Sequence, residues 1–455
     1  MCSTNCGENV GAVGVLLCSN EIPKIWIDNG NFDDYYTDMK YYQGKEIWVL
    51  ITTLTGLLVG CIRYFAKYPE DLSGFFKEIN SCHVEPRHVP WTITISAISL
   101  AGGGCLGPEA CLGNMGGGLG TFISERMKLT DEGDRKLVVL GGMGAALGAL
   151  FPSPFLGVLL ICELCIELPK PYMECLTVLS VPAIVSFSVF YSLGPEAYLP
   201  ALEANFYLTQ AWEFELYHCW YGLCVGLVSG CLCLIQLLSV GVCKQLFFRL
   251  KQRIDGIKFL SGTIIAPMVG GLILGLINYT LPLTVGNGNL VSAPLIRNAA
   301  MNIHMDRALL LQSAFAKMFC LAISMNCGLI GGFIFPMLTV GIMAACVAYQ
   351  IYPDVPLLLF LGCFLAGIPS GVCPMPITLI ALPCTLFFIG LEQTAPIFIA
   401  ATTSYCIVVG SGVFAALQTR AAARADSTVG NNDPNWSDLE GKQYDKPKKE
   451  LRDYM

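Results

Sequence analysis

Long apolar stretches recur along this chain and limit what it can fold into. They are Ile47–Phe65, Leu137–Phe151, Phe155–Ile166, Tyr217–Leu238, Phe259–Ile277, Phe333–Val347, Leu357–Leu365 and Pro396–Leu417. Several of them approach the roughly 20 residues that a helix needs to cross a bilayer. Only 13% of the 455 residues are charged, whereas a soluble domain has about 25%. The sequence therefore predicts an all-α, multi-pass integral membrane protein surrounded by lipid.

The composition also divides the chain into three parts. Residues 46–420 form one hydrophobic block, which we take as the membrane domain. Residues 1–45 are mixed and acidic, and they hold at most the remnant of a first spanning helix. Residues 421–455 are polar and charged. Because such a tail cannot bury enough apolar surface to offset its ordering entropy, we expect it to be disordered.

Two glycine-rich motifs stand between apolar stretches of the block, where helices would begin. One is Gly107-Pro108-Glu109-Ala110 and the other is Gly331-Gly332-Phe333-Ile334-Phe335-Pro336. A helix start carries unpaired N–H groups and a partial positive charge, so it can hold an anion. Glu109 is in addition an ionisable residue within apolar sequence, which makes it a functional candidate. Together the motifs indicate an anion pathway inside a membrane.

The block also repeats itself weakly. Aligning Pro154 with Pro376 gives an offset of 222 residues, and aligning Gly107 with Gly332 gives 225. Duplicated halves of inverted topology around a central binding site are a common plan in transporters. We therefore expect two halves, about residues 46–195 and 212–420, built from tilted and broken helices.

In their order and spacing, these motifs resemble the CLC family of chloride channels and chloride/proton exchangers. Gly107–Ala110 resembles the family's Gly-x-Glu motif in a divergent Gly-Pro-Glu-Ala form, and Gly332–Pro336 resembles its Gly-x-Phe-x-Pro motif. Ser73-Gly74 keeps the centre of a third motif. The resemblance implies a homodimer with one pore per subunit, chloride as the transported ligand and no cofactor. It implies neither an enzyme nor a nucleic-acid partner.

The resemblance also implies roles for individual residues. Glu109 would be a gating carboxylate that competes with the anion and carries a proton, and the backbone N–H groups of Phe333 and Ile334 would face a central anion. Ser73 would add a hydroxyl donor. The anion-binding positions implied in this way are Ser73, Gly74, Gly107, Gly332, Phe333, Ile334 and Phe414. Simpler interpretations are a helix cap for Ser73 and a carboxylate that only stabilises a helix dipole for Glu109.

Two departures from the family pattern bear on proton coupling. Leu164 stands where exchangers of the family often carry an internal proton glutamate, and Phe414 stands where an inner-gate tyrosine is usual. Both predict weak proton coupling, with the adjacent Glu163 as the carboxylate that could substitute.

The sequence leaves three kinds of transport open. We expect passive or proton-coupled transport of chloride through a pore with a glutamate gate, similar to a voltage-gated chloride channel. The alternatives are a chloride/proton antiporter and a transporter of another small anion, fluoride or nitrate. An intramembrane enzyme is disfavoured because Glu109 and Glu163 have no catalytic partners or metal motif near them in sequence, and we predict no metal site.

Overall fold

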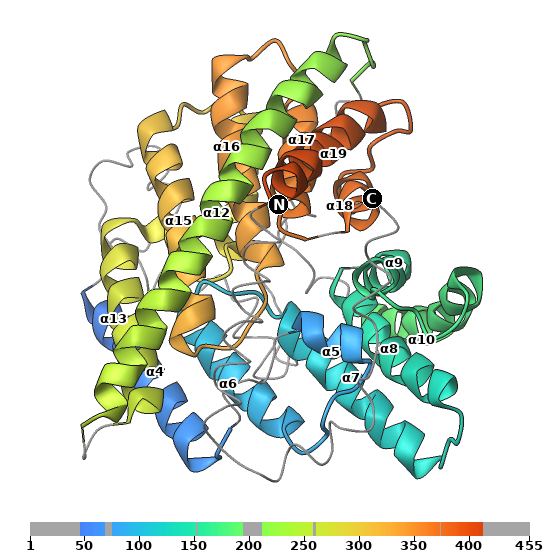
Figure 1. Ribbon diagram of the computed structural model, residues 1–455. Helices are drawn as coiled ribbons and strands as arrows, with labels where there is room; N and C mark the ends of the chain where they lie inside the picture. Colours follow the sequence, from blue (N-terminus) through green and yellow to red (C-terminus); the bar gives the residue numbers. More distant parts are fainter. Residues whose placement is uncertain are drawn as a thin grey trace. The chain divides into compact units, whose positions relative to one another are not determined.

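The computed structural model describes residues 46–68, 75–151, 153–193, 212–257, 261–373 and 375–412, and these residues form helices joined by short loops (Figure 1). The predicted N-terminal segment 1–45 and the polar tail 421–455 lie outside the described residues. The helices of the first part of the chain are α4 (Ile47–Phe65), α5 (Phe75–Ser81), α6 (Val89–Ala101), α7 (Glu109–Arg126), α8 (Glu132–Leu150), α9 (Pro154–Leu164) and α10 (Tyr172–Leu193).

The second part begins with the longest described helix, which crosses the view of Figure 1 in green. Its helices are α12 (His218–Asp255), α13 (Gly262–Thr280), the 3-10 turn η2 (Pro282–Thr284), α14 (Asn289–Ala300), α15 (Arg307–Cys327), α16 (Ile334–Ile351), α17 (Leu357–Ser370), α18 (Pro376–Leu386) and α19 (Thr394–Gly410).

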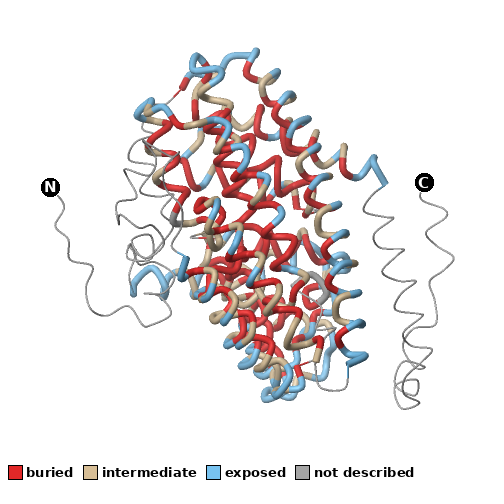
Figure 2. Tube along the Cα trace, turned by 90° about the vertical axis from the view of Figure 1, so that its left-hand side faces the viewer, coloured by how far each residue is buried: buried red, intermediate tan, exposed pale blue. Residues whose placement is uncertain are grey.

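Within the described ranges, six helices are long and apolar enough to cross a membrane: α4, α10, α12, α13, α15 and α16. The helices α6, α9, α17, α18 and α19 are apolar but shorter, as expected of half-helices inside a membrane domain. Many exposed side chains are large and apolar, such as Val181 and Leu193 of α10 and Leu58 of α4. Such a surface suits lipid, while the buried positions gather between the helices (Figure 2).

The repeat predicted from the sequence is present as pairs of matching helices. The helices α7 and α16 both have 18 residues, and they begin just after the aligned Gly107 and Gly332. The helices α9 and α18 both have 11 residues and begin at the aligned Pro154 and Pro376. The matching lengths and starts, which extend beyond the motif residues, support the predicted CLC-like repeat of broken helices.

Several helix pairs approach so closely that only glycine fits between them. A Cβ atom on Gly56 of α4 would lie 2.1 Å from the carbonyl oxygen of Pro267 in α13. Between α7 and α8, a Cβ on Gly116 would lie 2.2 Å from the oxygen of Gly142, and a Cβ on Gly142 would lie 2.1 Å from that of Gly116. Since small residues allow such backbone contact in membranes, these glycines set the helix spacing that holds α7 in place.

One buried charge fastens a loop to this helical framework. Lys317 of α15 is fully buried. Its Nζ donates to the carbonyl oxygens of Thr284, Val285 and Gly286 at 3.2, 3.4 and 3.1 Å. Because a buried ammonium needs acceptors, these three carbonyls fix the loop between α13 and α14 against α15.

We expect Gly142→Ala to destabilise the protein by about 1–3 kcal/mol, because the new methyl group would force α7 and α8 apart. Gly144→Ala on the same helix is the matched control, since its Cβ would have its nearest neighbour at 3.6 Å. Thermal unfolding in detergent measures both variants. Equal melting temperatures for Gly142→Ala and Gly144→Ala would contradict the close approach of the two helices.

Candidate anion pathway

The starts of α7 and α16 meet through a pair of backbone hydrogen bonds. The N–H of Gly107 donates to the oxygen of Gly332 at 2.7 Å, and the N–H of Gly332 donates to the oxygen of Gly107 at 2.6 Å. The residues that follow, Glu109 and Ile334, begin the two helices. Two positive helix ends therefore converge at one point, which favours a negative charge there.

The Glu109 carboxylate occupies this point. Its Oε1 accepts a hydrogen bond from the backbone N–H of Phe335 at 2.8 Å, and the residue is only 1% exposed. No residue in the described part of the chain donates to its buried Oε2. The first N–H groups of a helix have no partner within the helix, and here a carboxylate satisfies one of them. The site thus holds an anionic group supplied by the protein itself.

Glycine is required on both sides of this carboxylate. A Cβ on Gly107 would lie 2.1 Å from Oε2 of Glu109, and a Cβ on Gly332 would lie 1.9 Å from the same atom. Any side chain at either glycine would therefore displace the carboxylate from the helix start.

The residue that donates to this carboxylate also packs by its side chain. The Phe335 ring stacks on that of Phe151 with centroids 5.8 Å apart.

The structure places the other predicted site residues as follows. Phe333 and Ile334 are buried and lie at the start of α16, with Phe333 as the residue just before it. Ser73, Gly74 and Phe414 lie outside the described residues. Phe335, whose N–H binds Glu109, was not among the site residues predicted from the sequence. Its position in the first turn was a usable signal, because every N–H of a first turn is free to bind an anion.

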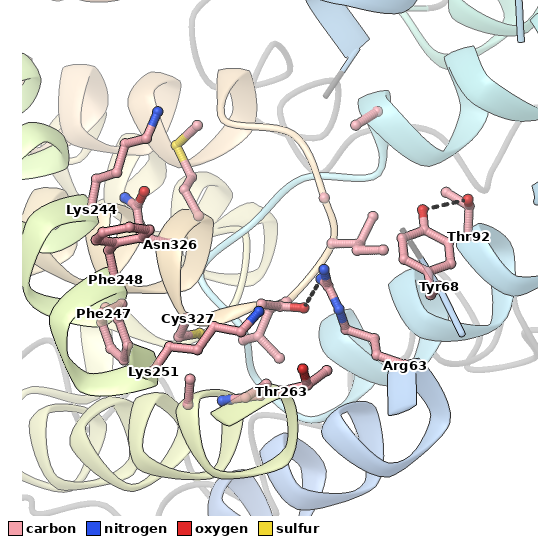
Figure 3. Close-up of a pocket in the computed structure, with 18 of the residues that line it drawn as sticks. Arg63, Tyr68, Thr92, Lys244, Phe247, Phe248, Lys251, Thr263, Asn326 and Cys327 are labelled. Carbon is pink, nitrogen blue, oxygen red and sulfur yellow. Dashed lines mark hydrogen bonds between the residues drawn. The ribbon is translucent and has the colours of Figure 1, made fainter. Parts of the chain in front are cut away.

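A cavity of about 490 Å³ lies beside the two helix starts. We call it the Arg63 pocket. Arg63 of α4 donates from Nη1 to the oxygen of Gly328 at 2.7 Å, and Lys244 and Lys251 extend from α12 on the other wall (Figure 3). Its lining also includes Ala110 and Gly331, the neighbours of Glu109 and Gly332. The pocket therefore joins a basic wall to the backbone beside the carboxylate.

Glu163 holds the start of another helix. Its Oε1 accepts from the N–H of Ile377 at 3.0 Å, and its Oε2 accepts from the N–H and the hydroxyl of Thr378 at 2.7 and 2.5 Å. The carboxylate therefore binds the free N–H groups at the beginning of α18. Glu163 does not line the Arg63 pocket. This geometry favours a structural role for Glu163 over a role in proton transfer.

We expect Glu163→Ala to lower stability by about 1–3 kcal/mol, because it leaves the α18 start without its acceptor. Glu167→Ala in the following loop is the control, since that residue is exposed. Melting temperatures in detergent report both changes. If the two variants melt together, Glu163 does not anchor α18.

This chain is similar to known proteins along most of its length. A family model described as voltage gated chloride channel matches residues 51–409. The H(+)/Cl(-) exchange transporter ClcA of Klebsiella pneumoniae is 28% identical over 311 residues, which cover 65% of this chain and 61% of that protein. ClcA of Citrobacter koseri is 27% identical over 353 residues, covering 74% and 68%. The chain thus spans 61% of the length of the Klebsiella relative.

Solved structures share the fold. The crystal structure of a slow cyanobacterial Cl-/H+ antiporter superposes with a TM-score of 0.66 at 17% identity, over 84% of this chain and 88% of that one. A CLC-type fluoride/proton antiporter superposes with a TM-score of 0.58 at 15% identity, over 80% and 95%. Since the family model covers nearly all of the helices described above, this chain belongs to the voltage gated chloride channel (CLC) family of multi-pass integral membrane proteins.

Proposed function

We propose that this protein transports chloride across a membrane along a pathway gated by the carboxylate of Glu109. The observation that carries the proposal is the hydrogen bond from the Phe335 N–H to Glu109 at a point where two helix starts converge. A site that stabilises a carboxylate oxygen also suits a small anion, because backbone donors bind both without a full positive charge that would trap the ion.

In this mechanism the carboxylate and chloride compete for the same donors. Ionised Glu109 fills the site and closes the path. When Glu109 is protonated or displaced, it leaves the start of α16, and the N–H of Phe335 becomes free for chloride. The N–H groups of Phe333 and Ile334 would bind a second, central anion together with Ser73 and Gly74, and Phe414 would border that site.

The Arg63 pocket would serve as the approach to the gate. Arg63, Lys244 and Lys251 line it, and positive charge in a low-dielectric cleft raises the local concentration of anions. The lysines belong to α12, whereas the N–H that binds Glu109 belongs to Phe335 of α16. Chloride would therefore be attracted by charge and then bound by weaker backbone dipoles, which allows rapid release.

We also propose a homodimer with one pathway in each subunit, by analogy with the family. Chloride is then the transported ligand, the bilayer is the surrounding medium, and transport requires no cofactor.

Chloride/proton exchange is a second candidate, favoured by the names of the ClcA relatives. Transport of another small anion such as fluoride or nitrate is the remaining alternative, and one structural neighbour is a fluoride/proton antiporter. Chloride, fluoride and nitrate efflux from the same proteoliposomes would rank the anions.

We expect chloride efflux from proteoliposomes to rise as pH falls in the wild type, since a protonated Glu109 carries no charge and leaves the helix start. Glu109→Gln cannot titrate, so its efflux should not depend on pH. Glu109→Ala cannot occupy the site and should be constantly open. Wild-type pH dependence in both variants would exclude Glu109 as the gate, and no chloride efflux from the wild type would refute the proposed function.

We expect Ser73→Pro to shift preference from chloride toward nitrate. Proline removes a hydroxyl and an N–H donor, which penalises the smaller and more strongly hydrated chloride most. Ser73→Thr keeps both donors and is the matched control. Efflux measured with each anion gives the ratio, and an unchanged ratio in Ser73→Pro would leave Ser73 as a helix cap only.

A further inference from the structure

Glu78 is a buried carboxylate that the gating mechanism above does not use. It lies in the short helix α5 and is 8% exposed. Its Oε1 accepts a hydrogen bond from Nδ2 of Asn114 in α7 at 2.7 Å. A buried ionisable residue is costly to keep, and in membrane proteins such residues usually serve ion or proton movement.

Glu78 lines the same cavity as the residue that follows Glu109. Glu78 lines the Arg63 pocket together with Ala110 and Asn114, which are four residues apart and therefore share one face of α7. Ala110 directly follows Glu109. The same cavity thus touches Glu78 and the backbone next to the gating carboxylate.

Asn114 is a suitable partner for both protonation states of Glu78. Its Nδ2 donates to the carboxylate as the structure stands. Its Oδ1 is buried and has no partner among the described residues. If the amide turns over, Oδ1 can accept a hydrogen bond from a protonated Glu78. The carboxyl can therefore gain and lose a proton without leaving itself unpaired.

The Arg63 pocket beside Glu78 is large enough to hold water molecules that can carry protons. Arg63 and Tyr68 lie on one side of the pocket, and Lys244 and Lys251 lie across it on α12. The pocket volume would hold on the order of ten waters at about 30 Å³ each. Water in such a cavity can pass protons between two carboxylates that do not touch.

Helix α9, which also packs against α5, carries Glu163, so the titratable groups near α5 are thiols and this second carboxylate. At the far end of α5 the Cys82 and Cys165 sulfurs lie 3.9 Å apart, joining α5 to the segment after α9. On α7, Cys111 is the titratable residue next to Ala110. Thiols are weak acids, and the Glu163 carboxylate is held by the N–H groups of Ile377 and Thr378 at the start of α18, so Glu163 is the one rival that the test includes.

We propose that Glu78 is a second proton-carrying carboxylate, which exchanges protons with Glu109 through water in the Arg63 pocket and couples protons to chloride. The O–H bond of Glu78 breaks as one forms on water, and the last water of the chain gives a proton to Glu109, so no redox partner is needed. This inference rests on the proposed chloride transport. It places the acceptor on α5 instead of at the position of Leu164, and it replaces the weak proton coupling expected from the sequence with coupled exchange.

The test uses the full-length protein in proteoliposomes. A chloride gradient is imposed, and internal pH and chloride efflux are followed together. The wild type should move protons uphill. Glu78→Gln, which has nearly the same shape, should lower the ratio of protons to chloride at least about tenfold while chloride still flows. Glu163→Gln tests the rival carboxylate and should keep the wild-type ratio.

Each outcome decides between the proposals. Chloride efflux without uphill proton movement in the wild type would overturn the role of Glu78 and leave chloride transport intact. Wild-type coupling in Glu78→Gln, or loss of coupling only in Glu163→Gln, would also overturn it. If Glu78→Gln cannot be purified in folded form, Glu78→Thr replaces it. Threonine is smaller and also cannot titrate, so the same fall in the ratio of protons to chloride is expected. A purely structural Glu78 would lower both fluxes together and keep their ratio.

Discussion

The contact between Gly107 and Gly332 is the constraint on which the rest of the site depends. Two backbone hydrogen bonds hold these glycines together, and they fix the starts of α7 and α16 at one point. The convergence of these starts sums two partial positive charges, and the missing side chains leave space for an anionic group. The Glu109 carboxylate fits into that space.

Backbone groups stabilise each of three buried or half-buried charges in this protein. The N–H of Phe335 binds Glu109, the N–H groups of Ile377 and Thr378 bind Glu163, and three carbonyls bind Lys317. A buried charge requires hydrogen-bond partners, and broken helices supply them without opposing side-chain charges. The same breaks that weaken the helices therefore create the sites that hold charge.

Glu109 and Glu163 show how far sequence reasoning reaches for individual carboxylates. Both were singled out because they stand in apolar sequence. The structure separates them, because Glu109 lies at the meeting of two helix starts, whereas Glu163 lies near the end of α9 and its carboxylate binds the start of α18 alone. Glu78 was not singled out, since Phe75–Ser81 is a short segment with no motif residue of its own. Its burial and its bond to Asn114 appear only once α5 packs on α7.

The sequence by itself determined the membrane class, the broken-helix repeat and the identity of the gating candidate. These features are local: apolar stretches of spanning length, helix-starting Gly-Pro motifs and two agreeing offsets. Each can be recognised from the residues of the segment itself. Only the tertiary structure decided that Gly107 bonds to Gly332, that Phe335 is the donor to Glu109, and that one pocket is lined by both Glu78 and Ala110, the residue after Glu109. These contacts link residues far apart in the chain, and they depend on close helix packing, such as that at Gly116 and Gly142, which no local pattern encodes.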